Sequence, residues 1–184
     1  GWGCGRIKLG TESNAGYRNI TISNCSFIWS CGLALEEVDR GKMENIVVSN
    51  ISMSHIHHYP IYITTGCRNR GPEDCTDISS ARDICIDNVI ADDVDSWSGI
   101  TITGMDGTPI RNVSLSNIRI QYRGGGKKAV APYPELGIRY PEPSQVGSTP
   151  SYGLFARHVD GLKLHNVEFE LMTPDERPDI IIEE

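Results

Sequence analysis

Apolar and polar residues alternate along most of this chain, and one alternating segment recurs. The segment YRNITISNCSF (17–27) returns as MENIVVSNISM (43–53), ARDICIDNVIA (81–91), IRNVSLSNIRI (110–120) and VDGLKLHNVEF (159–169). Each copy carries an asparagine at the same place, and these are Asn24, Asn50, Asn88, Asn117 and Asn166. A period of two predicts a β-strand with one buried face, and the recurrence predicts a repeat architecture.

A second family of short strands interleaves with the first. Its members are RIKLG (6–10), GLALE (32–36), PIYIT (60–64), GITIT (99–103), GLFAR (153–157) and DIIIE (179–183). Their inward apolar pairs are spaced by 26, 28, 39, 54 and 26 residues, so the basal unit is about 26 residues. Because no helical period separates the strands, a fold with crossover helices is not expected.

The fold class predicted from these repeats is all-β. The expected architecture is a right-handed, single-stranded parallel β-helix, a solenoid of about six coils. In such a fold the repeated asparagines would stack about 4.8 Å apart as an asparagine ladder, each side-chain amide bonded to the next. The alternative is that each asparagine only marks a turn.

The length of 184 residues, with 39% apolar and 22% charged residues, fits one soluble domain. Two insertions interrupt the repeats, at 66–80 and 121–151. The glycines and prolines of 121–151 argue against regular structure, and Tyr133 and Tyr140 with Arg123, Lys127 and Lys128 would suit a flap over an acidic glycan. An oligomer contact is the competing interpretation. Because the chain enters a strand almost at once, we expect residues 1–184 to be the carboxy-terminal part of one β-helix domain whose amino-terminal coils are absent.

Charge and cysteine content exclude several classes of partner. The net charge of −7 argues against nucleic acid, and no apolar run is long enough to span a bilayer, so no membrane partner is expected. The six cysteines include no CxxC pair, so no metal site and no cofactor are predicted. Cys67 and Cys75 bracket a loop and could form a disulfide if the protein is exported.

Four asparagines begin N-x-[ST] triplets, namely Asn19, Asn24, Asn50 and Asn112. The strand alternation itself produces these matches. Because ladder asparagines are expected to point inward, glycosylation is not implied.

The segment GCGRIKLGTES (3–13) resembles the GHG-x-x-x-IG-S-E stretch of glycoside hydrolase family 28, the polygalacturonase family, with Gly3, Gly5, Gly10 and Glu12 on matching positions. The resemblance continues through the asparagine-marked coils, through HYPIYI (58–63) and through residues 140–162, so it covers nearly the whole chain. It implies a pectin-degrading glycosidase that acts on a pectic poly- or oligosaccharide.

Two departures from the family pattern concern the substrate. Cys4 replaces a family histidine, and Ala34 and Glu36 stand where the family has an arginine and a lysine that hold uronate carboxylates. A negative charge at that position would repel a uronate. The resemblance therefore points to rhamnogalacturonan-type glycans and, among family members, is closest to exo-acting enzymes.

The candidate substrate-binding residues are Tyr59, His58, Glu12, Arg68 and Arg70. Tyr59 matches a family tyrosine and offers a stacking face and a hydroxyl, although it could instead pack within a turn. His58 lies beside Tyr59, and Glu12 matches a family position. Arg68 and Arg70 could replace the lost clamp through bidentate binding, or lie in a solvated loop.

No residue of this chain is given a catalytic role. Hydrolysis with inversion needs an acid and a base roughly 6.5–9.5 Å apart. The resemblance assigns these roles to three aspartates on coils upstream of residue 1, so we expect the chain alone to be inactive. The missing amino-terminal part is thus an expected partner, and the expected localisation is secreted or periplasmic. A non-catalytic glycan-binding β-helix and a polysaccharide lyase of the same fold remain as alternatives.

Overall fold

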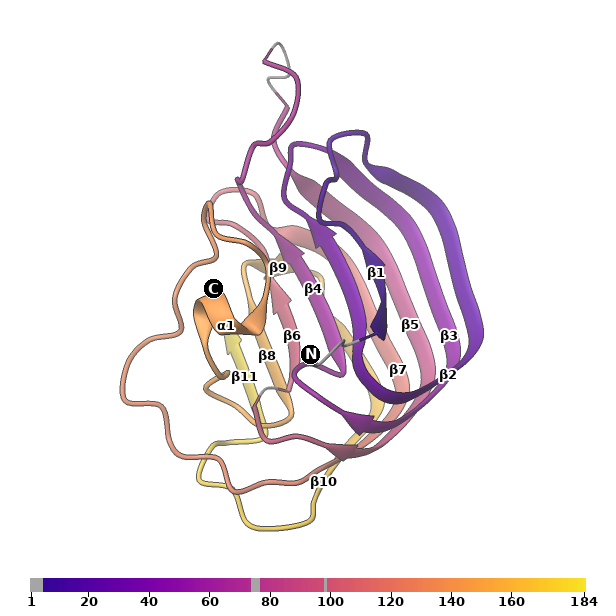
Figure 1. Cartoon of the computed structure of the whole chain (residues 1–184), viewed down its shortest axis with the longest axis vertical. Helices are drawn as coiled ribbons and strands as arrows, with labels where there is room; N and C mark the ends of the chain where they lie inside the picture. The colour runs from indigo at the N-terminus through magenta and orange to yellow at the C-terminus, as the bar shows by residue number, and fades with distance from the viewer. Residues whose placement is uncertain (1–4, 74–76, 98) are drawn as a thin grey trace.

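The computed structural model describes residues 5–73, 77–97 and 99–184, with only the main chain at residues 143 and 144, and it is all-β (Figure 1). The strands are β1 (Gly5–Leu9), β2 (Tyr17–Glu37), β3 (Lys42–Ile56), β4 (Ile61–Thr65), β5 (Ser80–Val94), β6 (Ile100–Thr103), β7 (Ile110–Tyr122), β8 (Leu154–Arg157), β9 (Val159–Asp160), β10 (Lys163–Leu171) and β11 (Ile180–Glu183). A single helical turn, α1 (Pro143–Val146), interrupts them. Within the described residues, no helix has both the length and the apolar character needed to cross a membrane.

Every pairing between these named strands is parallel, and together they form one curled sheet (Figure 1). The long strands β2, β3, β5, β7 and β10 are neighbours in one part of the sheet. The short strands β1, β4, β6, β8 and β11 are neighbours in the other part, with the end of β2 inserted between β1 and β4. The chain runs through a long strand and then a short one before it begins the next layer. This arrangement is consistent with a parallel β-helix.

Equivalent residues of successive layers lie side by side on adjacent strands of the sheet. Ile46 of β3 pairs with Ile84 of β5, and Ile63 of β4 lies between Leu35 of β2 and Ile102 of β6. All five side chains are buried in the same apolar core. Burying a side chain of this size stabilises the fold by roughly 1.5–3 kcal/mol. The prediction that the alternating apolar residues form the core is confirmed.

The long strands bend at residues with a positive φ angle that lie five positions apart. In β2 these residues are Asn19, Asn24 and Trp29, with φ of 57°, 57° and 56°. Strands β3 and β5 bend at the equivalent positions. Asparagine tolerates this left-handed conformation, which costs most other L-residues roughly 1–2 kcal/mol. The repeated asparagines therefore mark a bend in each layer.

Asparagine side chains of adjacent layers are hydrogen-bonded to each other in part of the stack. Asn50 Nδ2 donates to Asn24 Oδ1 over 3.0 Å, and Asn88 Nδ2 donates to Asn50 Oδ1 over 2.8 Å. In the following layer Asn117 donates to Asp87 over 2.9 Å instead, and the asparagine of the last repeat donates to Asn117 over 2.9 Å. Each of these four pairs of adjacent layers is thus linked by an amide hydrogen bond, but in one pair the acceptor is Asp87 and not an asparagine.

These asparagines are exposed, so the prediction that they point inward is wrong. The reason is the bend itself. Val48 and Ile51 are both buried, but two residues, Ser49 and Asn50, separate them instead of the single residue of a regular strand. The additional residue at the bend faces outward, and strict alternation does not reveal it.

The 121–151 segment covers the outward face of the short strands (Figure 1). Tyr133, Leu136 and Val146 of this segment are buried against Phe155 and Val38. Apart from the end of β7 and α1 it forms no helix or strand, in agreement with its glycine and proline content. The described part of the 66–80 insertion instead extends away from the ends of the short strands (Figure 1).

The cysteines differ from expectation in one respect. Cys67 is a free thiol, so the predicted disulfide with Cys75, which lies outside the described residues, is not formed. Cys31 is disulfide-bonded, and its partner lies outside the described residues.

Asn50→Ala should lower the free energy of unfolding by about 1–3 kcal/mol, because it removes two amide hydrogen bonds and places an alanine at a positive φ. Asn50→Gly removes the same bonds but tolerates the backbone conformation. We therefore expect the glycine variant to lose less stability than the alanine variant in urea denaturation. Equal losses would show that the bend does not select asparagine for its backbone.

Candidate functional site

The outward face of the short strands carries a buried ion pair. In β2 the alternation that places Leu33 and Leu35 in the core turns Ala34 and Glu36 to the opposite face. Lys8 Nζ of β1 lies 2.8 Å from Glu36 Oε2, and the Glu36 side chain is 0% exposed. A buried carboxylate needs such a partner because desolvation disfavours its charge.

The 121–151 segment closes over this ion pair. Glu142 Oε2 lies 3.1 Å from Arg6 Nη2, and Glu142 Oε1 lies 3.5 Å from Lys8 Nζ. Thr11 Oγ1 donates to the Tyr140 hydroxyl over 2.9 Å, and Lys8 Nζ lies 5.0 Å from the centroid of the Tyr140 ring. We name this group the Lys8–Glu36 cluster, which consists of Arg6, Lys8, Thr11, Glu36, Tyr140 and Glu142.

Glu36 of this cluster and its neighbour in the sequence, Glu37, both have raised pKa values. Burial raises the pKa of Glu36 from 4.5 to about 7, although the hydrogen bond and charge of Lys8 oppose the shift. Burial also raises the pKa of Glu37 to about 7, against hydrogen bonds from Ser13 and from main-chain amides. Among the described residues, Glu36 Oε1 has no hydrogen-bond partner. A carboxyl group in this state can exchange a proton near neutral pH and can bind a hydroxyl group.

Glu12 and Arg68, two of the predicted binding residues, lie together. Arg68 Nη2 contacts Glu12 Oε1 at 2.8 Å and Asp39 Oδ2 at 2.7 Å, while its Nε donates to Asp39 Oδ1 over 3.2 Å. The hydrogen bond from Arg68 lowers the pKa of Glu12, and the bond to Asp39 raises the pKa of Arg68. The guanidinium fork is thus occupied by carboxylates of this chain, so it is not open to a uronate in this conformation.

Arg70 is exposed next to this network, and its main chain rather than its side chain is anchored there. Its amide donates to Asp39 Oδ1 over 3.1 Å, and its carbonyl accepts a hydrogen bond from Asn14 over 2.6 Å. The side chain is therefore presented to solvent at the rim of the sheet.

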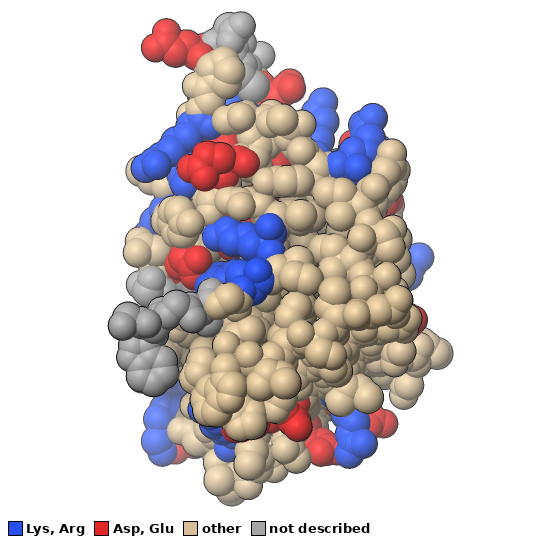
Figure 2. Space-filling model, turned by 45° about the vertical axis from the view of Figure 1, so that its right-hand side comes forward, with Lys and Arg blue, Asp and Glu red and all other residues tan. Residues whose placement is uncertain are grey.

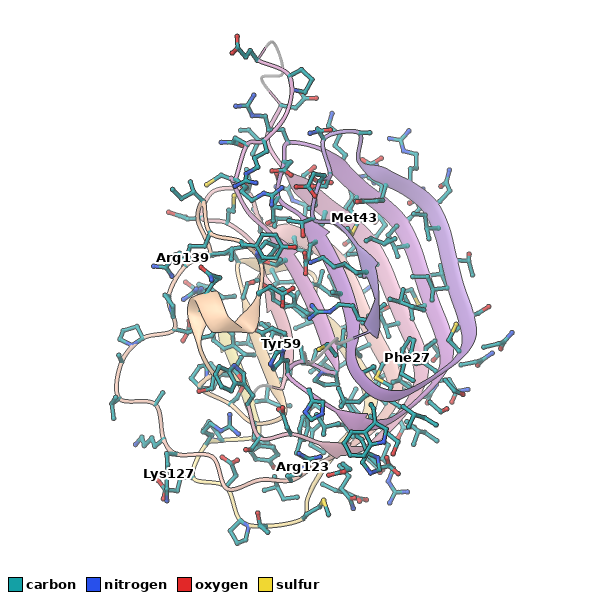
Figure 3. The ribbon with its side chains drawn as sticks, viewed as in Figure 1. Phe27, Met43, Tyr59, Arg123, Lys127 and Arg139 are labelled. Carbon is teal, nitrogen blue, oxygen red and sulfur yellow. The ribbon has the colours of Figure 1, made fainter. Side chains whose placement is uncertain are left out.

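Tyr59 lies beneath the 121–151 segment (Figure 3). Its ring is stacked on Tyr62 with centroids 4.4 Å apart, and its hydroxyl lies 3.2 Å from that of Tyr133. The residue is 1% exposed. Contact between Tyr59 and a saccharide would therefore require displacement of the covering segment.

His58 lies at the other end of the short strands, away from Glu12 and Arg68. Its amide donates to Asp95 Oδ2 over 2.9 Å, and its ring centroid lies 6.0 Å from that of Trp97. No group of three His, Cys, Asp or Glu side chains suited to a metal ion occurs among the described residues. The predicted binding residues thus lie in three separate places.

Arg6, Lys8 and Glu142 are not among the binding residues predicted from the sequence. The alternation of the RIKLG strand places Arg6 and Lys8 on the same side, so the sequence pattern could have predicted that both lie on this face. Glu142 had no comparable signal, because it reaches Arg6 from a position 136 residues later in the chain.

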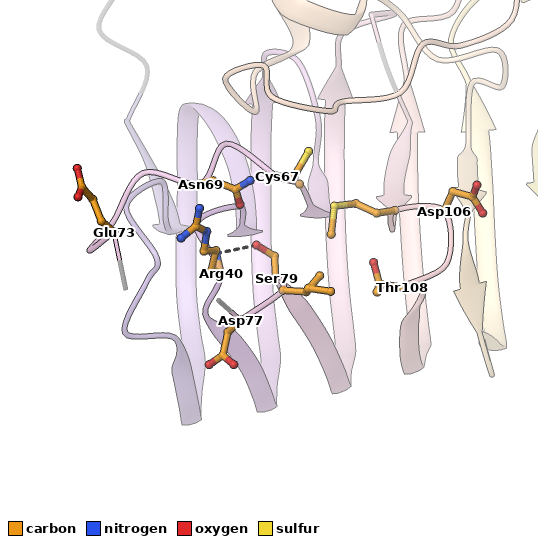
Figure 4. A pocket seen from close by; sticks show the side chains of 11 residues that line it. Arg40, Cys67, Asn69, Glu73, Asp77, Ser79, Asp106 and Thr108 are labelled. Atoms are coloured by element: carbon orange, nitrogen blue, oxygen red, sulfur yellow. Dashed lines mark hydrogen bonds between the residues drawn. The ribbon is translucent and has the colours of Figure 1, made fainter. Parts of the chain in front are cut away.

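A separate cavity of about 580 Å³ lies beside the loops that follow the short strands (Figure 4). It is lined by residues that include Arg40, Cys67, Asp77 and Asp106, and the Arg40 amide donates to Ser79 Oγ over 2.8 Å. None of the predicted binding residues lines it.

Positive and negative side chains are interspersed at the surface. Figure 2 shows Lys and Arg side chains beside Asp and Glu side chains, with a broad uncharged area between the charged groups. On this face the described residues therefore form no continuous basic patch. A polyanion would have to be recognised there by individual side chains and not by a general positive charge.

Comparison with known protein families places the chain among the glycosidases. The model of glycosyl hydrolases family 28 matches residues 7–135, and the chain belongs to this family. This agrees with the resemblance found in the sequence and supports a pectin-degrading glycosidase with a pectic polysaccharide as its substrate. Comparisons with curated proteins and with solved structures gave no match.

The raised pKa values of Glu36 and Glu37 predict a stability that falls as the pH rises from about 4.5 to about 7. In this window the folded protein holds protons that the unfolded chain has released, so each rise in pH favours unfolding, by roughly 1–3 kcal/mol per carboxyl over the whole window. Glu36→Gln should flatten the profile measured by urea denaturation. The control Glu12→Gln should keep the decline, because the pKa of Glu12 is lowered. An unchanged slope in Glu36→Gln would contradict the assignment.

Proposed function

We propose that this chain is the carboxy-terminal part of a pectin-degrading hydrolase of family 28. It would cleave galacturonosyl linkages in (rhamno)galacturonan-type glycans with inversion and in an exo-acting manner, and it would be secreted or periplasmic. The observation that carries the proposal is the family match over residues 7–135. The fold proposed for the whole domain is a right-handed parallel β-helix, to which this chain contributes about six coils and an asparagine ladder.

Partly exposed apolar residues at one end of the stack support the presence of further coils. Ile20 and Ile22 of β2 are only half-buried, whereas Ile46 and Val48, which pair with them in the next layer, are 0% exposed. The first part of β2 also forms an edge of the sheet. A preceding coil would cover these side chains and pair this edge, and the catalytic aspartates are proposed to lie on such coils.

The chemistry of the outward face supports a substrate with both acidic and neutral sugars. Glu36 stands at a position where an ionised carboxylate would repel a uronate, but its pKa of about 7 keeps it protonated under mildly acidic conditions. The Glu36 side chain is 0% exposed, so it would reach a sugar only after the covering segment moves; the protonated group would then donate a hydrogen bond to a sugar oxygen, and the ionised group would accept one from a hydroxyl. The role proposed for this chain is to bind and orient the glycan while the upstream aspartates carry out the proton transfers.

The 184-residue chain alone should release no galacturonate from pectic oligosaccharides, whereas a polypeptide extended upstream by the aspartate-bearing coils should release it. Reducing-end assays and chromatography of the products give the measurement, and the anomeric form of the first product, followed by NMR, tests inversion. Turnover by residues 1–184 alone would refute the assignment of the catalytic groups to upstream coils.

A further inference from the structure

We propose that Trp29 and Trp97 form a binding surface for neutral sugar units of a pectic glycan. This inference rests on the proposed function, because it names a class of sugar that the same chain would bind. We name the surface the Trp29–Trp97 row, and it consists of Trp29, His55, His57, His58 and Trp97.

The members of the row come from three successive layers. Trp29 lies at the third bend of β2 and His55 at the equivalent bend of β3, while Trp97 lies between β5 and β6. The turns that lead from the long strands into the short strands lie at the bottom of the view in Figure 1. Ring centroids are 4.3 Å apart for Trp29 and His55, 6.1 Å for Trp29 and His57, and 6.0 Å for His58 and Trp97. Because layers stack about 4.8 Å apart, the row spans about 10 Å, which suits an oligosaccharide better than one sugar ring.

Both tryptophan side chains are open to solvent. Trp29 is 60% exposed and Trp97 is 42% exposed. Trp97 belongs to the third layer, so its exposure does not result from the open end of the stack. Trp29 has a φ of 56°, which is unfavourable for a bulky side chain, whereas the other two bends of the same strand carry Asn19 and Asn24. A strained, exposed tryptophan at a bend where asparagine is tolerated better indicates a role in binding rather than in folding.

Hydrogen bonds hold the row in place. Asp95 Oδ1 accepts the amide of Trp97 over 2.9 Å, and its Oδ2 accepts the amide of His58 over 2.9 Å. The same Oδ2 lies 3.8 Å from His57 Nδ1. The buried Arg177 donates through Nη1 to the Trp97 carbonyl over 3.2 Å. The turn that carries Trp97 is therefore fixed from two sides, which lowers the entropic cost of binding a ligand.

The chemistry of the row favours a neutral sugar over a uronate. An indole ring offers an apolar face to the C–H groups of a pyranose, and imidazole and carboxylate groups bond to its hydroxyl groups. Asp93 and Asp95 place two partly exposed carboxylates beside the rings, and His55 Nε2 lies 3.5 Å from Asp93 Oδ2. The guanidinium of Arg123 donates to Asp93 over 3.1 Å and is thus already bound to a carboxylate of this chain. A uronate carboxylate would be repelled here, whereas a primary alcohol would not.

The test measures binding of two tetrasaccharides to the 184-residue chain by isothermal titration calorimetry. One is tetragalacturonate, and the other is the neutral galactotetraose obtained when its carboxyl groups are reduced to alcohols. The two probes have the same rings and linkages, so they differ only in charge. Trp29→Asn and Trp97→Asn should each weaken binding of the neutral probe about tenfold, because a stacking face is lost, and should change the affinity for tetragalacturonate little.

The choice of asparagine separates binding from folding at Trp29. Because asparagine tolerates the bend, Trp29→Asn should be at least as stable as the unmodified chain in urea denaturation while it loses affinity. Val130→Asn is the matched control, since Val130 is 103% exposed on the covering segment, and its affinity for both probes should not change.

Three results would overturn the proposal. These are unchanged affinity for the neutral probe in both folded tryptophan variants, no binding of that probe by any variant, and an equal loss of affinity for tetragalacturonate. Self-association of the unmodified chain that Trp29→Asn abolishes, measured by sedimentation velocity, would also overturn it, because the row would then contact a second copy.

The outcome is distinguishable from that of the proposed function. If the extended polypeptide hydrolyses pectic oligosaccharides while the tryptophan variants bind as the unmodified chain does, only this inference fails. If the variants lose affinity for the neutral probe as expected but no hydrolysis occurs, only the proposed function fails.

Discussion

The structure depends on the parallel, in-register stacking of successive layers. β3 is hydrogen-bonded to β2 on one side and to β5 on the other with no shift in register. A slip of one residue would turn Ile46 and Val48 outward and bring Asn45 and Val47 into the core. Because Ile46 and Val48 are 0% exposed and pack in the main apolar core, that slip would remove a large part of the stabilising burial. Register therefore fixes both the core and the residues presented on the outer face.

The bends in the long strands are the second constraint. They explain why asparagine recurs at positions that are not buried. A bend adds one residue between two inward positions and places it in the left-handed region. Asparagine tolerates this conformation, and its amide also bonds to the neighbouring layer. The third bend position is different, because it is occupied by Trp29 in β2 and by His55 in β3, whose rings lie 4.3 Å apart. The two rings are in contact and tilted by 41° to each other, so a side-chain contact accompanies the unfavourable backbone conformation there.

The chemistry of the outer face results from contacts between distant parts of the chain. The short strands supply Lys8 and Glu36, while the covering segment supplies Tyr140 and Glu142. Burial is the main reason that the pKa of Glu36 reaches about 7, and the charge of Glu142 raises it further. The insertion thus belongs to the site as much as the sheet does.

The sequence by itself determined the strands, their inward residues, the parallel repeat and the family. These follow from local alternation and from recurrence, which a single chain displays directly. The direction of the asparagines was mispredicted, because a strict period of two does not contain the additional residue of a bend. Only the tertiary structure decided that Tyr59 is covered, that the fork of Arg68 is occupied by Asp39 and Glu12, and that Glu142 reaches Arg6 and Lys8. Those outcomes depend on where a segment without regular structure packs, and no periodicity in the sequence encodes that position.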